Sequence, residues 1–208
     1  MATAFITHQD CHLHNMGSYH PESPLRLSAI NDHLIATGLG THLAYYDAPL
    51  AQTEHLLRVH PQSYIEELQR SAPLSGIVHL DPDTAMCPQT LGAALRSAGA
   101  GVLAVDLVLS GKVENAFCAI RPPGHHAERR RAMGFCFFNN VAIAAAHALE
   151  AHGLERVAIA DFDVHHGNGT EDIFSNDARV LMVSTFQHPL YPYSGTENPA
   201  PNMFNVPL

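Results

Sequence analysis

The chain has 208 residues, 46% of them hydrophobic, and a formal net charge of −9 at pH 7. This length fits a single domain, 1–208, with a full core. Lys112 is the only lysine and no basic run longer than the three arginines 129–131 occurs, which argues against nucleic-acid binding, because phosphate neutralisation needs clustered Lys and Arg.

Targeting signals and cysteine spacing set further limits. The N-terminus has no basic region followed by an apolar core, and no apolar run is long enough to span a bilayer. The four cysteines lack Cys-x-x-Cys spacing, so neither a disulfide framework nor a metal knuckle is indicated. We therefore expect a soluble cytoplasmic protein with reduced thiols and no membrane partner. The acidic balance suits a cationic partner, but ordinary soluble proteins share it.

Predicted strands and helices alternate along the chain. A strand is expected at 4–7, followed by helices at 24–35, 53–57, 62–69 and 90–109, the last alanine-rich and ended by Gly111. A strand at 116–120, a helix at 140–152, a buried strand at 157–162, a short helix at 169–174 and a strand at 180–186 follow. Residues 187–208 predict a long loop without a closing strand. This order predicts an α/β fold, a mostly parallel sheet with helices on both faces.

Two of these strands end in clusters of histidines and carboxylates. Residues 121–126 are Arg-Pro-Pro-Gly-His-His, and residues 161–169 are Asp-Phe-Asp-Val-His-His-Gly-Asn-Gly. Asp163 and His165 are two residues apart, so on an extended backbone both side chains point to one face. A carboxylate beside an imidazole is half of a metal site whose usual occupant is zinc. His125 and His126 titrate near neutrality, as acid–base catalysis requires.

Each motif alone is weak evidence. Polar pairs at strand ends are commonly only solvated, and a His-His pair is unremarkable in a chain with 16 histidines. Two such motifs, each after an apolar run and each before a glycine-marked helix start, favour a catalytic metal. The first hypothesis from the residues is therefore a metal-assisted hydrolase.

Longer motifs carry a resemblance to a known family. The segments Arg-Pro-Pro-Gly-His-His-Ala, Gly-Phe-Cys-Phe-Phe-Asn-Asn at 134–140, and Asp-Phe-Asp-Val-His-His-Gly-Asn-Gly-Thr at 161–170 resemble zinc-dependent histone deacetylases. The likeness is to class II enzymes and to bacterial deacetylase-like and acetylpolyamine amidohydrolases. Residues 20–27, His-Pro-Glu-Ser-Pro-Leu-Arg-Leu, match the family's N-terminal pattern. The resemblance implies the arginase/deacetylase α/β fold and hydrolysis of an acylated amine.

The resemblance also implies catalytic roles. Asp163 and His165 would be two zinc ligands, and His125 and His126 the acid–base pair, with His126 the principal base and acid. Asp161 would orient His125. Asn168 occupies the place of a class I aspartate, so His126 should have a less elevated pKa than in class I enzymes. His166 is expected to be structural.

Substrate and ion contacts follow from the same resemblance. Gly134 and Phe135 would form one tunnel wall and Tyr191 the opposite one. Asp83 would hold the substrate backbone at the rim, or would only belong to an Asx-type turn. Phe137 and Phe138 are expected in the core, and Cys136 as a buried thiol. Structural K⁺ would be bound by backbone carbonyls of Asp161, Asp163 and His165, with Ser184 and Thr185.

Two expected parts do not follow His166. The family's third zinc ligand, an aspartate, and its oxyanion-stabilising tyrosine lie further downstream, so we expect this domain to be truncated before both. The substrate would be an acetyl-lysine peptide or an acetylpolyamine, and an incomplete core would favour a homo-oligomer. The alternatives are an inactive fragment, pseudo-enzyme or binding module, and, less favoured, an arginase-type ureohydrolase, which needs a carboxylate where Gly167 stands.

Overall fold

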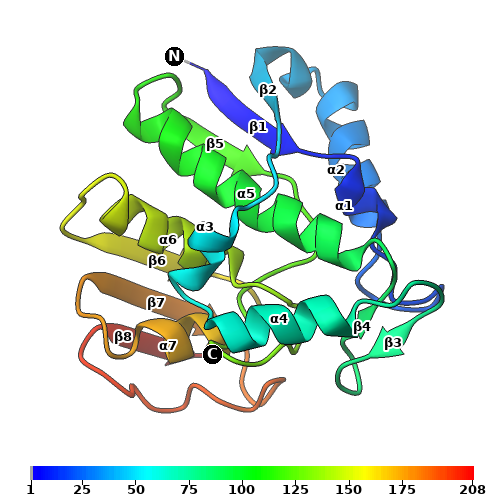
Figure 1. The fold of residues 1–208 in the computed structure, drawn as a ribbon. Coiled ribbons are helices and arrows are strands. Elements are labelled where there is room, and N and C mark those ends of the chain that lie inside the picture. The colour runs from blue at the N-terminus through cyan, green and yellow to red at the C-terminus, as the bar shows by residue number, and fades with distance from the viewer. Residues whose placement is uncertain (1) are drawn as a thin grey trace.

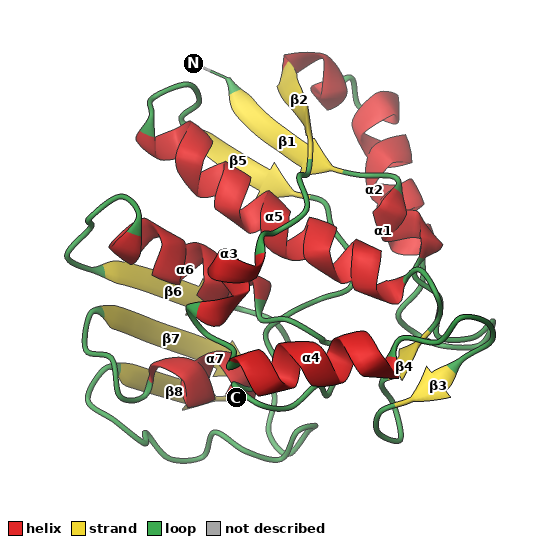
Figure 2. Ribbon diagram, viewed as in Figure 1, coloured by secondary structure: helices red, strands yellow, loops and turns green. Residues whose placement is uncertain are grey.

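The computed structural model describes residues 2–208, and its strands form two three-stranded parallel sheets (Figures 1 and 2). The first has the order β2-β1-β5 and consists of Leu43–Asp47, Thr3–Thr7 and Asn115–Cys118. The second has the order β6-β7-β8 and consists of Val157–Asp161, Val180–Phe186 and Met203–Pro207. A short antiparallel pair, β3 (Val78–His79) and β4 (Ala85–Met86), lies apart from them. Parallel sheets joined by helices confirm the predicted α/β class.

Helices lie on both faces of the first sheet. Ala4 and Ile6 of β1 pack against the long helix α5 (Thr90–Leu109). Phe5, on the opposite face, packs with α2 (Leu25–Ala36) through Leu27. The alternation of side chains along β1 therefore serves two separate hydrophobic clusters.

The second sheet has one covered face and one exposed face. Its inner side chains join the main core with α4 (Gln62–Ser71), α6 (Asn140–Glu150) and α7 (Asn168–Phe174). The outward side chains of β7 and β8 are between 36 and 49% exposed, and they are Leu181, Val183, Phe204 and Val206. Short helices α1 (Asp10–Leu13), η1 (Leu39–His42) and α3 (Thr53–Leu57) complete the described elements.

Two sequence-based expectations are wrong, and a third meets a weak counter-indication. Residues 187–208 are not all loop, because Met203–Pro207 pairs in parallel with β7 as β8. The strand before Phe162 is not fully buried, and Phe162 itself is 88% exposed. By length and composition α5 could cross a membrane, contrary to our expectation. That evidence is weak, because α5 packs within the fold against β1 and α6, as a core helix does.

Candidate active site

The two strand-end motifs meet at a common edge of the fold. Residues 119–126 follow β5 and residues 162–167 follow β6, so both leave the carboxyl ends of parallel strands. Two backbone hydrogen bonds join them, because the N–H groups of Gly169 and Thr170 donate to the carbonyl of His125 at 2.9 and 3.2 Å. The motifs border a cavity of about 680 Å³. Its lining consists of Pro21, Glu22, Arg26, Asp83, Pro123, His125, His126, Gly134, Phe135, Asp163, His165 and Tyr191.

His125 is oriented by the carboxylate at the end of β6. Its Nδ1 lies 2.9 Å from Asp161 Oδ2, as expected from the sequence. Burial would raise the pKa of Asp161, but the hydrogen bond and the charge of His125 outweigh it and hold this pKa below its usual value. Asp161 is therefore a carboxylate at neutral pH, and the proton between the two groups belongs to His125 Nδ1. The other ring nitrogen, Nε2, lies 3.9 Å from Asp163 Oδ1.

His126 is oriented by an amide rather than a carboxylate. Its Nδ1 lies 2.8 Å from Asn168 Oδ1. The amide group of Asn168 has a fixed orientation, because Nδ2 donates to Glu128 Oε1 at 2.9 Å. The Asn168 oxygen must then accept from His126 Nδ1–H, which leaves Nε2 of His126 without the proton. Glu128 was not singled out from the sequence, since its partner lies 40 residues away and no local pattern marks it.

The pKa of His126 is set mainly by its environment in the fold. The residue is 4% exposed, and burial together with the neighbouring His125 lowers its pKa to about 3. The two imidazole rings are 4.0 Å apart between centroids. Two charged imidazoles at this distance would repel each other in a poorly solvated site, so His126 is neutral at physiological pH. A neutral ring with a bare nitrogen is suited to accept a proton.

Asp163 and His165 lie side by side at the cavity. His165 Nδ1 is 3.0 Å from Asp163 Oδ1, and the two side chains are 35 and 49% exposed, respectively. One oxygen and one nitrogen donor facing an open cavity match two ligands of a catalytic zinc site. A third ligand is not evident among the described residues, because no further His, Cys, Asp or Glu side chain groups with Asp163 and His165 at metal-ligand spacing.

Gly134, Phe135 and Tyr191 border the same cavity, as predicted. Gly134 has φ +56°, and a Cβ there would lie 2.4 Å from His126 Cδ2, so only glycine fits this close approach. The Phe135 ring packs edge-on against His20 at 4.6 Å. The Tyr191 ring packs edge-on against His126 at 5.1 Å and against His165 at 6.1 Å.

Of the two alternatives left open by the sequence, the structure places Asp83 at the cavity and does not give it the Asx-type turn. It borders the cavity, and its Oδ1 accepts from Thr84 Oγ1 at 2.9 Å. The Asx-type turn is made by Asp81, whose Oδ1 accepts from the N–H groups of Asp83 and Thr84 at 3.0 and 2.6 Å. Burial and the neighbouring Asp81 raise the pKa of Asp83.

The remaining predicted residues lie below the cavity. Ser184 pairs in register with Asp161 across β6 and β7, and its buried Oγ has no hydrogen-bond partner among the described residues. His166 is 1% exposed and bonds to Ser194, Glu171 and Asn205, which is a structural role. Phe137, Phe138 and Cys136 are buried as expected.

A buried ion pair connects the N-terminal motif to the tandem-histidine motif. Arg121 is 0% exposed, and its Nε and Nη2 donate to the two carboxylate oxygens of Glu22, both at 2.5 Å. Further bonds run from Arg121 to the carbonyls of Cys11 and His14. Neither residue was proposed as part of the site, although both lie in the quoted motifs. Together they hold the segment 119–126 against the N-terminal loop.

Comparison with known proteins identifies the family. The model of the histone deacetylase domain matches residues 20–208. The chain therefore belongs to the histone deacetylase family. It is 42% identical to a histone deacetylase-like amidohydrolase of Pseudomonas aeruginosa over 86% of this chain and 47% of that protein. It is 40% identical to a probable deacetylase of Archaeoglobus fulgidus, with 94 and 54% covered.

A solved deacetylase structure confirms the fold. The crystal structure of the HDA15 HD domain superposes with a TM-score of 0.93 at 33% identity, covering 99% of this chain and 61% of that one. The human polyamine deacetylase HDAC10 is 40% identical over 88% of this chain and 29% of its own length. The chain thus spans about half the length of several curated deacetylases that it matches, or less.

Proposed function

We propose that this chain supplies the acid–base half of a zinc-dependent deacetylase that hydrolyses the amide of an acylated amine. The observation that carries the proposal is the pair of histidines with matched tautomers: each has Nδ1 bonded to an acceptor and presents Nε2 toward one cavity. Asp163 and His165 would hold the zinc ion at that cavity. Bound zinc lowers the pKa of a water molecule and polarises a carbonyl.

The two histidines and their hydrogen-bond partners would have different roles in proton transfer. His126 Nε2 accepts the proton of the attacking water and returns it to the leaving amine. Asp161 accepts a hydrogen bond from His125 Nδ1, whereas Asn168 offers His126 an oxygen without negative charge. Burial and the neighbouring His125 lower the pKa of His126, so its Nε2 carries no proton in the ground state and can accept one. Gly134, Phe135 and Tyr191 would bind the narrow aliphatic stem of the substrate.

The third zinc ligand and an oxyanion-stabilising tyrosine would come from polypeptide outside these 208 residues. Relatives that extend well beyond the matched region support this. The substrate class is an acetyl-lysine peptide or an acetylpolyamine, since both present an amide on such a stem. The polyamine deacetylase among the relatives supports the second.

We also propose that a structural K⁺ binds beside the residues that would hold zinc. The orphaned Oγ of Ser184 lies in a strand paired with the end of β6, where the backbone carbonyls of Asp161, Asp163 and His165 and the adjacent Thr185 can supply further oxygens. Hard oxygen ligands suit such an ion. An arginase-type reaction is disfavoured, because a Cβ at Gly167 would lie 2.3 Å from Asp161 Oδ2 and leave no room for a metal-binding carboxylate.

The test is acetate release from an acetyl-lysine peptide and from an N-acetylated polyamine. It compares the 208-residue chain with a C-terminally extended product, each with zinc and with a chelator. Activity is expected in the extended product, lost with chelator and in His126→Ala, and retained in His33→Ala, which removes an exposed histidine of α2. An extended, zinc-loaded product without activity on either substrate would point to a pseudo-enzyme or binding module.

A further inference from the structure

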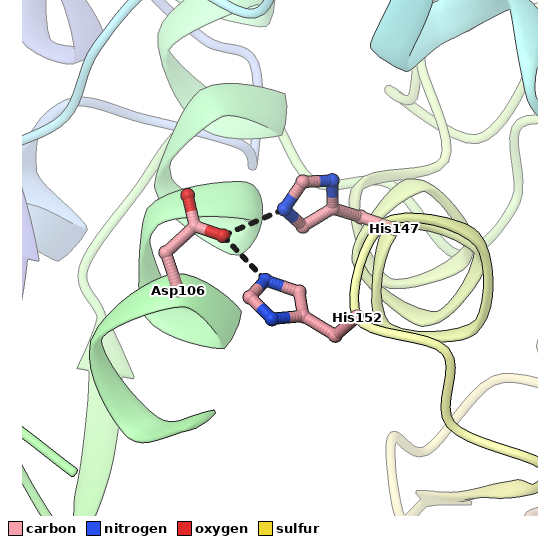
Figure 3. Close-up of side chains that lie close together, drawn as sticks. All are labelled: Asp106, His147 and His152. Carbon is pink, nitrogen blue, oxygen red and sulfur yellow. Dashed lines mark hydrogen bonds and ion pairs between the residues drawn. The ribbon is translucent and has the colours of Figure 1, made fainter. Parts of the chain in front are cut away.

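A second cluster of metal-ligating side chains lies between helices α5 and α6, away from the strand ends. Asp106 of α5 faces His147 of α6 and His152, which follows that helix (Figure 3). Asp106 Oδ1 is 2.7 Å from Nε2 of each histidine. The three ligand atoms lie within 4.8 Å of one another. Among residues 2–208, no other group of three His, Cys, Asp or Glu side chains meets this spacing.

The packing of the two helices creates this cluster. A Cβ at Gly101 of α5 would be 3.1 Å from Ala144 Cβ and 3.2 Å from the Asn140 carbonyl, so the backbones approach closely there. Asp106 lies five residues further along α5, and His147 lies three residues further along α6. His147 is therefore 6% exposed in the interface, while Asp106 and His152 reach the surface.

The cluster is separate from the proposed catalytic cavity. The amino-terminal end of α6 adjoins that cavity's wall, because Asn139 donates to the carbonyl of Ala127. His147 lies eight residues after Asn139, roughly 12 Å along the helix at 1.5 Å per residue, and His152 lies beyond the helix's carboxyl-terminal end. None of the three residues borders the cavity.

We propose that Asp106, His147 and His152 bind a zinc ion that clamps α5 to the end of α6. Two imidazoles and one carboxylate are ligands that zinc accepts, and tetrahedral coordination leaves a fourth position for water. Zinc ligands at about 2.0–2.2 Å from the metal are a little over 3 Å apart. The bonds of 2.7 Å to Asp106 must therefore lengthen slightly as the ion takes the place between them. His152 lies in a turn ended by Gly153, so it can make this adjustment.

Arg58 opposes this coordination, and its effect on zinc binding can be tested. Its Nη1 donates to His147 Nδ1 at 2.9 Å, which places the imidazole proton on Nε2, toward Asp106. Coordination through Nε2 moves that proton to Nδ1, where it would face the guanidinium N–H. Arg58 must then turn toward Glu150, whose Oε2 already lies 3.3 Å from Arg58 Nε. Zinc binding should consequently tighten when Arg58 is replaced.

The experiment uses a background in which Asp163→Asn and His165→Ala remove the zinc donors of the catalytic cavity. Zinc affinity and stoichiometry are measured by competition with a chromophoric chelator, and Co²⁺ absorption reports tetrahedral coordination. We expect one equivalent of zinc. Loss of a residue that only supports a metal ligand typically weakens binding roughly 10–100-fold. Because His152 would contact the zinc directly, adding His152→Ala should weaken zinc binding by more than that. His152 is exposed, so this change spares the core.

Two comparisons decide the outcome. His33→Ala in the same background should bind zinc unchanged, and Arg58→Ala should bind it more tightly. Zinc at one hundred times its Kd should raise the Tm of the background protein by about 5–10 °C, and not that of the His152→Ala variant. Equal affinity with and without His152 overturns the site, and weaker binding by Arg58→Ala overturns coordination through His147 Nε2.

Discussion

Replacing Glu22 by glutamine should destabilise the fold severely, although the substitution keeps the shape of the side chain. The carboxylate is 7% exposed and accepts two hydrogen bonds of 2.5 Å from Arg121, which is 0% exposed. Arg121's other hydrogen-bond partners are the backbone carbonyls of Cys11 and His14, which carry no charge. Glutamine would leave the guanidinium buried without a counter-charge and would turn an N–H group toward it.

The expected cost is about 3–5 kcal/mol, as for other buried pairs that lose one partner. This is a large share of the roughly 5–15 kcal/mol by which ordinary domains are stable. The measurement is the free energy of unfolding from urea titration. Glu66→Gln is the matched control, because Glu66 is exposed on α4 and its carboxylate accepts a hydrogen bond from the exposed Gln62 at 2.9 Å. We expect this control to stay within about 0.5 kcal/mol of the parent.

A loss below about 1 kcal/mol for Glu22→Gln would refute the reasoning, since the pair would then contribute no more than a surface ion pair. Removing both charges gives a second check. The double variant Arg121→Met with Glu22→Gln should lose less unfolding free energy than the sum of the two single variants. In the double variant both charges are gone, so no unpaired charge stays buried. Additive losses would mean that the two side chains act independently.

Three further predictions concern a histidine, a glycine and a serine. Burial lowers the pKa of His60 to about 4 in the folded protein, so the unfolded chain binds more protons than the folded one between about pH 4 and 6.5. The free energy of unfolding should therefore rise with pH across that window by up to about 3 kcal/mol, and by less in His60→Gln. Gly134→Ala should cost more stability than Gly111→Ala, since both glycines have positive φ but only Gly134 would clash, with His126; equal Tm losses would rule out the clash. If K⁺ binds as proposed, K⁺ should raise Tm more than Na⁺ does, and Ser184→Ala should abolish the difference.

The sequence predicted those helices and strands that are marked by their own composition and by the residues directly flanking them. The helix 90–109 was predicted with both bounds, because alanine-rich sequence runs up to a breaker at Gly111. The strand 180–186 was predicted from its apolar run alone. β8 was missed because its pattern is short and ends in Pro207, and its pairing depends on the exposed edge of β7. Met203 is 1% exposed because, once β8 has paired with β7, its side chain joins the main core.

The site was predictable only where its spacing is local. Asp163 and His165 were expected side by side from their spacing, and they do lie 3.0 Å apart, but in a bend after β6 has ended at Asp161 rather than on an extended strand. Glu22 and Arg121 are 99 residues apart, so their pairing exists only after the chain has folded. The same holds for the cluster of Asp106 with two histidines, whose members are 41 and 46 residues away. Tertiary contacts of this kind leave no periodic trace in a single sequence.

The second ring nitrogen separates the two histidines proposed for acid–base chemistry from a structural histidine of this fold. His60, His125 and His126 all direct Nδ1 to an oxygen, respectively a backbone carbonyl, a carboxylate and an amide. For His60, Nε2 accepts a backbone N–H at 3.0 Å, so both nitrogens are satisfied and the ring can exchange no proton. For the tandem pair, Nε2 is directed to the cavity instead. Because Glu128 fixes the amide of Asn168, this tautomer of His126 is imposed by the fold before any substrate binds.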